Sequence, residues 1–334
     1  MGRPLSTPPP ALFNRPTRSS PPESSHPPPQ VKVCVLCTGS DLPVLRDAGL
    51  ILESLPCVPN INPEHVITHT SQLIGDALDE FFGLTDIKEG ALLILILSCH
   101  GTLCRDNNVL LQFKAQDGAT VDSRLLQDKI MALPKHCTLE ASTLTVVVDT
   151  CYAEHVIPGL YRVSTLDNSP TLCPMPVVAP EFIATLTPPS GSRLSSRISA
   201  FSASSSAHSS ASSHVTGLEL PSFYEQDRPK YKAQVIVWAA STGWSNSFTE
   251  ENLPEAPGVY SIFIGAMFNQ LSSNGSGMSR RSFWQDILTV VERHNNVRRE
   301  RDLRKPPAVQ ANLKNRTQTA SLLTSVDNPV RLLN

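Results

Sequence analysis

Two short polar segments, SCHG at 98–101 and DTC at 149–151, bring a histidine and a cysteine directly after strongly apolar runs. A thiol beside an imidazole can act as a nucleophile, because His100 would take the proton of Cys151 and later return a proton to a leaving amine. The backbone N–H groups of Gly101 and Cys151 could together stabilise a developing oxyanion. The residue types therefore predict cysteine-dependent nucleophilic chemistry.

The runs that precede these segments, Ala91–Leu97 and Thr143–Val148, are apolar on both faces, as central strands of a buried parallel sheet are. Chemistry in such folds lies beyond the carboxyl ends of the strands, so both segments are expected at the same edge of the sheet. Taken alone, the cysteine is more commonly a core thiol, and the histidine more commonly a structural hydrogen-bonding residue. Their joint arrival, with Gly101 after the histidine and Asp149 before the cysteine, favours the catalytic interpretation.

Strand-like and helix-like segments alternate around these two runs. Further strands are predicted at Val31–Cys37, His65–Thr68 and Gln234–Ala239. Helices are predicted over Val44–Leu55, from a cap at Thr70 or Ser71 to Gly83, after a cap at Asp122, over Gly258–Leu271, and after a capping box of Ser282 with Gln285. This alternation predicts an α/β fold in which helices cover both faces of a mostly parallel sheet.

The composition restricts the classes of partner. The chain has 334 residues, 28 basic and 30 acidic side chains and a net charge of −2, which argues against a nucleic-acid binder. No apolar run reaches the roughly 18 residues that span a bilayer. The N-terminus also lacks the apolar region of a secretory signal. We therefore expect a soluble cytoplasmic protein without nucleic-acid or membrane partners.

The eight cysteines are scattered, and several lie inside apolar runs, so they are expected to be reduced thiols. Cys34 and Cys37 match a CxxC pattern, but residues three apart on a strand point to opposite faces. No zinc or redox site is expected at this pair.

Two stretches have compositions that cannot form a packed core. Residues 1–30 carry ten prolines and predict a disordered, partly polyproline arm. Residues 166–232 centre on a serine-rich run and predict a disordered linker. One α/β domain is thus expected in two parts, residues 31–165 with His100 and Cys151, and residues 233–334.

The two polar motifs resemble those of the metacaspases, a family of caspase-like cysteine peptidases. SCHG resembles the family's S-G-H-G, and DTCYA at 149–153 resembles its D-S-C-H-S-G. Likeness to the family continues in the helix–turn–strand segment 70–101, in LRDAGLILESL at 45–55 and in APGVYSIFIGAMFNQL at 256–271. The resemblance covers about residues 31–165 and 232–312, and a Pro-rich arm is typical of type I members.

The resemblance implies a caspase-like three-layer sandwich with a six-stranded, mostly parallel sheet, and a cysteine endopeptidase with a His100–Cys151 dyad. It assigns Ser98, Asp149 and Asp47 to positions that line the S1 pocket. Buried carboxylates in such a pocket favour Arg or Lys at the cleaved position of a protein or peptide substrate. As alternatives, Asp149 could bond amides of its own loop, and Asp47 could lie on a solvated helix face.

The serine-rich linker falls where caspase-like chains divide into a large and a small part. Such a segment is open to proteolysis, so self-cleavage of a zymogen after Arg193 or Arg197 is a hypothesis. The alternative is that these arginines are ordinary linker charges beside phosphorylated serines. The family analogy points to cell death (apoptosis-like), stress or protein quality control without selecting among them.

Several positions depart from the family pattern. Cys99 replaces a glycine, Val44 replaces a pocket cysteine, and YAE at 152–154 replaces H-S-G. The paired aspartates that help to bind calcium are reduced to Asp122 and Ser123, so calcium activation is in doubt, and no metal or cofactor is expected.

These departures leave a rival interpretation, a catalytically weak or inactive caspase-like domain that regulates or binds partners through its Pro-rich arm. A nucleotide-binding α/β protein is disfavoured, because CTGSDLP after the first strand offers a single glycine.

Overall fold

The structure is a computed structural model of the 334-residue chain. It describes residues 30–37, 43–58, 61, 66–69, 74–83, 87, 90–106, 108–113, 120–133, 143–164, 171–174, 231–243, 245–251, 258–274, 278–310, 313 and 316–326. The predicted Pro-rich arm up to residue 29, the helix cap at Thr70 or Ser71, and Arg193 and Arg197 lie outside the described residues.

One eight-stranded sheet forms the centre of the molecule, in the order β2-β1-β3-β7-β10-β13-β8-β9. Its strands are β1 (Val31–Cys37), β2 (Val66–His69), β3 (Leu92–Ser98), β7 (Thr143–Asp149), β8 (Tyr161–Ser164), β9 (Thr171–Pro174), β10 (Gln234–Ala239) and β13 (Ser321–Thr324). The first five strands in this order, β2, β1, β3, β7 and β10, pair in parallel. The other three, β13, β8 and β9, pair antiparallel. The predicted α/β class and mostly parallel sheet are confirmed.

The sheet is wider than the predicted six strands, because the β8–β9 hairpin extends it beyond β13. Strand β9 lies inside the segment predicted to be a disordered linker, so that prediction is wrong for Thr171–Pro174. The hairpin is held through backbone pairing, and its two strands of four residues each are too short to show a clear alternation of apolar and polar residues. The remainder of the predicted linker up to residue 230 lies outside the described residues.

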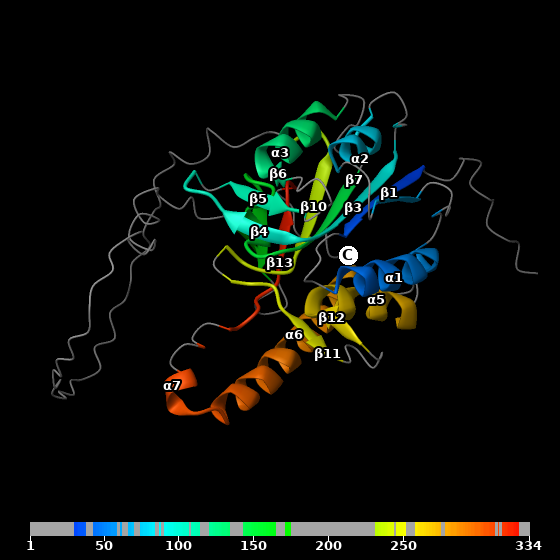
Figure 1. The fold of residues 1–334 in the computed structure, drawn as a ribbon. Helices are drawn as coiled ribbons and strands as arrows, with labels where there is room; N and C mark the ends of the chain where they lie inside the picture. Colours follow the sequence, from blue (N-terminus) through cyan, green and yellow to red (C-terminus); the bar gives the residue numbers. More distant parts are fainter. Residues whose placement is uncertain are drawn as a thin grey trace, which may run out of the picture.

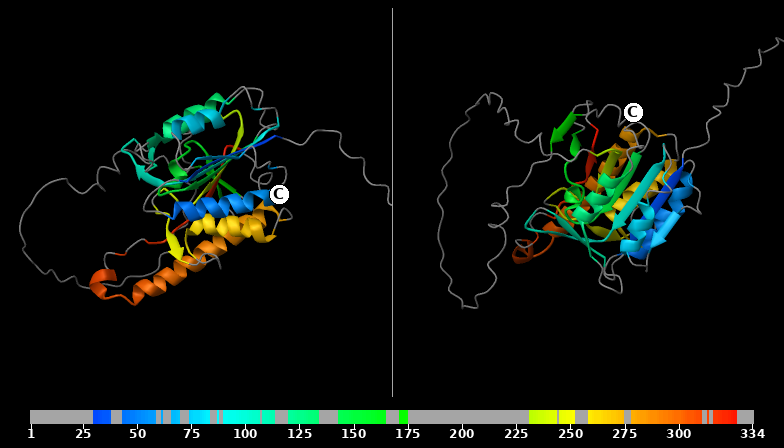
Figure 2. Two further views of the ribbon diagram at one scale, coloured as in Figure 1. Left: turned by 45° about the vertical axis from the view of Figure 1, so that its right-hand side comes forward. Right: turned by 90° about the horizontal axis from the view of Figure 1, so that it is seen from above.

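Helices cover both faces of the sheet and make three layers (Figures 1 and 2). The helices α1 (Val44–Ser54), α5 (Ile262–Asn274) and α6 (Arg280–Leu303) lie on one face, and α2 (Ile74–Phe81) and α3 (Ser123–Ala132) on the other. A 3-10 turn (Leu55–Cys57) follows α1, and the short α7 (Pro307–Gln310) follows α6. None of the helices formed by the described residues is long and apolar enough to cross a membrane.

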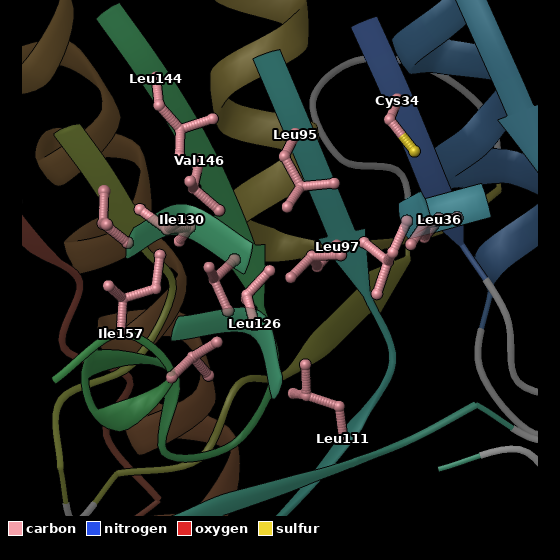
Figure 3. Packing of buried hydrophobic residues seen from close by; sticks show 14 of the residues in the cluster. Cys34, Leu36, Leu95, Leu97, Leu111, Leu126, Ile130, Leu144, Val146 and Ile157 are labelled. Atoms are coloured by element: carbon pink, nitrogen blue, oxygen red, sulfur yellow. The ribbon is translucent and has the colours of Figure 1, made fainter. Parts of the chain in front are cut away.

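The apolar central strands fill a core on each side of the sheet. Leu95 and Leu97 of β3 pack into the cluster that contains α2 and α3, and Ile96 packs into the cluster that contains α1, α5 and α6. Figure 3 shows Leu95, Leu97, Leu144 and Val146 beside Leu126 and Ile130 of α3. Each fully buried side chain of this size contributes about 1.5–3 kcal/mol of hydrophobic stabilisation.

The two cysteines of the CxxC pattern also divide between these clusters. Cys34 lies in the cluster beneath α2 and α3, and Cys37 lies in the opposite one. The prediction that the two thiols point to opposite faces is confirmed. Burial raises the pKa of Cys34 to about 12 and raises that of Cys37 as well, which is the behaviour of core thiols.

One predicted helix start is confirmed, and two others differ. Asp122 caps α3 as predicted, since its side chain accepts the Arg124 N–H at 2.8 Å. Helix α6 begins one turn earlier than predicted, because Ser279 is its cap and accepts the Ser282 N–H at 3.2 Å. Residues 259–261, predicted as helix, form strand β12 (Val259–Ser261), which pairs with β11 (Thr249–Glu251).

A second small sheet follows β3 directly. It contains β4 (His100–Leu103), β5 (Val109–Gln112) and β6 (Thr120–Asp122) in antiparallel order. Only one residue, Cys99, separates the end of β3 from the start of β4. The chain therefore turns sharply at the end of β3, and His100 stands at that turn.

Candidate functional site

Strands β3 and β7 are neighbours in register, so the segments that follow them leave the same edge of the sheet. Ser98 pairs with Asp149 at the last position of both strands. The Cys99 N–H then donates to the Asp149 carbonyl oxygen at 3.2 Å, one residue past the strand pairing. The predicted convergence of the two polar segments is confirmed as a backbone arrangement.

Gly101 brings the β4 backbone into direct contact with the segment that carries Cys151. A Cβ atom at Gly101 would overlap the Cys151 carbonyl oxygen and the Thr150 Oγ1. Glycine is required here because the chain's own backbone fills the space where a side chain would stand. His100, one residue earlier and half-buried, is thereby held at the segment of Cys151.

Cys151 is half-buried, and burial is the main cause that raises its thiol pKa. A hydrogen bond from the Ser247 backbone lowers this pKa, and the nearby Asp149 charge raises it. The neighbouring Cys99 is a buried core thiol whose pKa burial also raises. A base beside Cys151 is therefore needed to form the thiolate near neutral pH.

The turn after Cys151 is held by the segment that follows β10. Tyr152 adopts a left-handed conformation, with φ 61° and ψ 28°, and its N–H donates to the Ser245 carbonyl oxygen at 3.4 Å. The Ala153 N–H donates to Ser241 Oγ at 2.9 Å, and this hydroxyl donates to the Thr150 carbonyl oxygen at 2.8 Å. The backbone on both sides of Cys151 is thus bonded to one buried serine.

Glu154 adds a buried ion pair to the same turn. Its Oε1 accepts from Arg162 of β8, and its Oε2 accepts the Gly243 N–H at 2.8 Å. The side chain is 1 % exposed. A Cβ at Gly243 would overlap the His155 ring, so the two segments are closely packed. Glu154 joins the turn after Cys151 to β8 and to the segment after β10.

Sequence reasoning treated Glu154 as a departure from the family motif and missed this structural role. The available sign was a single acidic residue in the turn at 152–159, followed eight residues later by Arg162. Buried carboxylates are almost always paired, but the sequence leaves the partner open.

The three predicted pocket residues Ser98, Asp149 and Asp47 are all buried, at 4 %, 4 % and 1 % exposure. Ser261 joins the two carboxylates, because its N–H donates to Asp47 Oδ1 at 3.1 Å and its hydroxyl donates to Asp149 Oδ2. Asp149 Oδ1 accepts from the Ser247 hydroxyl. The alternative of a solvated Asp47 is wrong, because this residue is buried and bonded to the Ser261 backbone.

The partners of Asp149 contradict the alternative in which its side chain bonds amides of its own loop, while its place in a substrate pocket stays a prediction. Its side chain bonds Ser247, Ser261 and the Ile264 backbone, all from the second part of the domain, in place of amides of its own loop. Ser247 and Ser261 were missed by sequence reasoning, because single serines in β12 and the segment before β11 carry no distinguishing pattern.

Burial disfavours the ionised form of both carboxyl groups, Asp47 and Asp149. Burial, followed by the charge of Asp149, raises the pKa of Asp47 to about 8, although the Ser261 backbone bond lowers it. Burial raises the pKa of Asp149 as well. Among the described residues, no hydrogen-bond partner lies near Asp47 Oδ2, which is buried. Such a site favours a proton or a cation with N–H donors.

Within the part of the chain that the structure describes, no group of three or more His, Cys, Asp or Glu side chains could hold a metal ion. Asp122, considered above for calcium, is the cap of α3.

Neither a family model nor a curated protein matches this sequence. Among solved structures, the chain is similar to protein GSU0716 from Geobacter sulfurreducens, with a TM-score of 0.45 and 12 % identity over 92 % of this chain and 97 % of that chain. It is also similar to Caspase-1 from Spodoptera frugiperda, with a TM-score of 0.43 and 10 % identity over 88 % of this chain and 84 % of that chain. Neither likeness assigns an activity to this chain.

Proposed function

We propose that this protein is a cysteine endopeptidase of the metacaspase kind that cleaves proteins or peptides after Arg or Lys. The observation that carries the proposal is the pairing of β3 with β7, together with the close approach of Gly101 to Cys151. It holds the segments of His100 and Cys151 against each other at one edge of the sheet. The metacaspase-like motifs in the sequence support the same assignment.

The proposed reaction begins with a protonated thiol, since burial raises the pKa of Cys151. His100 takes the proton as Sγ attacks the carbonyl carbon of the scissile bond. The N–H groups of Gly101 and Cys151 stabilise the oxyanion. His100 then gives its proton to the leaving amine, which leaves a thioester on Cys151. Water, deprotonated by His100, hydrolyses the thioester and restores the thiol.

The proposed basic-residue pocket consists of Ser98, Asp149 and Asp47. A guanidinium or ammonium group would supply donors to Asp47 Oδ2, which has no hydrogen-bond partner among the described residues. The positive charge would also lower the pKa of Asp47 from about 8, so binding would release a proton. An Asp side chain in place of Arg would add a third carboxylate, which the pocket would reject.

A second candidate function is a catalytically weak or inactive caspase-like module that regulates or binds partners through its Pro-rich arm. It is favoured by the enclosure of the pocket, in which Ser247 and Ser261 already bond Asp149. A cytoplasmic location and self-cleavage after Arg193 or Arg197 remain parts of the first proposal.

The test is turnover of peptides ending in Arg, Lys or Asp by the full chain, with and without calcium, while intact mass is followed in the same tubes. Cys151→Ala should abolish cleavage after Arg and Lys and any processing of the linker. Cys104→Ala is the matched control, because this half-buried cysteine lies at the end of β4, outside the site, and should leave turnover unchanged. Absence of turnover in every condition by a folded chain would favour the inactive module.

A further inference from the structure

A cavity of about 230 Å³ is lined by the C-terminal half of α6, by Gln310 of α7 and by the segment that follows α7. Figure 1 shows this half of α6 running out toward α7. At about 30 Å³ for each water molecule, it has room for a tetrahedral ion together with its hydration or an ester substituent. Its charged lining consists of Arg298, Arg299 and Arg316 against one carboxylate, Asp302. The cavity is therefore rich in guanidinium groups.

The acidic residues near this cavity leave its positive charge largely in place. Asp302 bonds Lys305 at 2.7 Å as well as Arg316 at 3.2 Å, so a fourth cation balances it. Glu250 is bonded by both terminal nitrogens of Arg301, at 2.9 and 2.8 Å. Glu292 approaches Arg299 only at 4.0 Å, with both side chains more than half exposed. A surplus of guanidinium groups remains around the cavity.

Arg298 is the most unusual of these side chains, because it is 2 % exposed and yet incompletely bonded. Its guanidinium lies 4.1 Å from the centre of the Phe248 ring, and its Nη1 donates to the Arg316 carbonyl oxygen at 3.3 Å. Its buried Nη2 has no hydrogen-bond acceptor among the described residues, and Glu250 Oε2 is 3.6 Å away. A buried charged donor without an acceptor is costly, so a ligand that supplies one would be stabilised.

We propose that this cavity is a binding site for a phosphate-class oxyanion. A tetrahedral anion offers several acceptor oxygens at once, which suits the planar forks of Arg298, Arg299 and Arg316. Arg299 and Arg316 are 57 % and 36 % exposed, so the anion can enter from solvent, whereas Arg298, which also lines the cavity, is buried. The site is separate from Cys151 and does not depend on peptidase activity.

The test is calorimetric titration of the full chain with sodium phosphate and with sodium pyrophosphate, at constant ionic strength, against sodium chloride. Saturable binding is expected with phosphate or pyrophosphate and not with chloride. Arg316→Gln and Arg299→Gln should each weaken binding about tenfold or more, because each removes one charge-assisted contact. Arg293→Gln is the control, because it removes an exposed arginine of the same helix that does not line the cavity.

Near-ultraviolet circular dichroism of each variant separates lost binding from lost folding. The inference is overturned if the folded wild type binds neither anion at millimolar concentration, or if Arg293→Gln weakens binding as much as Arg316→Gln does. Titration with a peptide of residues 192–204, with and without phosphate on Ser199, then identifies the source. A phosphopeptide that competes with pyrophosphate indicates a phosphorylated protein segment, and failure to compete indicates a free anion.

Discussion

Glu154 provides a demanding test of how the turn after Cys151 is held. Its carboxylate accepts from Arg162 on one oxygen and from the Gly243 N–H on the other. Replacement by alanine removes both acceptors together. The Gly243 N–H then loses its partner beside the packed His155 ring, and the guanidinium of Arg162 loses its counter-charge. We expect Glu154→Ala to destabilise the fold substantially.

The size of the loss follows from burial. Breaking a buried ion pair by removing one partner costs about 3–5 kcal/mol. The Arg162 side chain is 38 % exposed and keeps part of its hydration, so the lower end, about 3 kcal/mol, applies. A domain of this size loses about 2–4 °C of Tm for each kcal/mol, which gives a decrease of about 6–12 °C. Glu154→Gln keeps one acceptor and should cost about 1–2 kcal/mol.

Thermal unfolding followed by circular dichroism measures these changes. Asp106→Asn is the matched control, because it breaks an exposed pair with Arg124, at 49 % and 58 % exposure, and should change Tm little. A double-mutant cycle of Glu154→Gln with Arg162→Gln isolates the coupling between the two side chains. A decrease for Glu154→Ala no larger than that for Asp106→Asn would refute the reasoning.

Three further predictions concern the site itself. Gly101→Ala forces a Cβ against the Cys151 carbonyl oxygen and should lower the free energy of unfolding in urea by about 1–3 kcal/mol. Gly49→Ala in α1 is the control, because nothing lies within 4 Å of the added Cβ, and it should be neutral or stabilising. Asp47, with its pKa raised to about 8, keeps in the folded state a proton that the unfolded chain loses above about pH 4. The contribution of Asp47 to folding stability should therefore fall as the pH rises from about 4 to about 8. Measured by urea unfolding, Asp47→Asn should be more stable relative to wild type at pH 8.5 than at pH 5.5. An equal difference at both pH values would contradict the raised pKa. Tyr152→Val places a β-branched residue at φ 61° and should lower Tm more than Tyr152→Asn, since Asn tolerates the left-handed region. The reverse order would show that packing of the Tyr152 ring contributes more to stability than its backbone conformation does.

The central strands and the convergence of the two polar segments could be predicted from the sequence. Runs such as Ala91–Leu97 and Thr143–Val148 are long, apolar on both faces and followed at once by polar residues, so strand type, burial and the position of the loops follow from local pattern. These strands are β3 and β7, within one residue of the predicted bounds. The same reasoning gave Asp122 as the cap of α3.

The remaining features depend on contacts between distant residues. Strand β13 is added to the sheet from the end of the chain, and β8 and β9 are added beyond it, by backbone pairing that leaves no local pattern. Ser261 bonds Asp47 across 214 residues and Asp149 across 112. A lone serine has no periodicity that reveals such a partner. Asp47 was considered for a solvated helix face because its partner Ser261 is 214 residues away, where no local pattern reveals it.

The most direct test of the proposed peptidase is covalent labelling by a peptide chloromethyl ketone that carries Arg, Lys or Asp at its reactive end. Peptide mapping by mass spectrometry identifies the labelled thiol. One adduct on Cys151 is expected, formed much faster with the Arg or Lys reagent than with the Asp reagent, and strongly slowed in His100→Ala. Equal labelling of Cys151 and Cys104, unaffected by His100→Ala, would contradict a His100-activated nucleophile beside a basic-residue pocket.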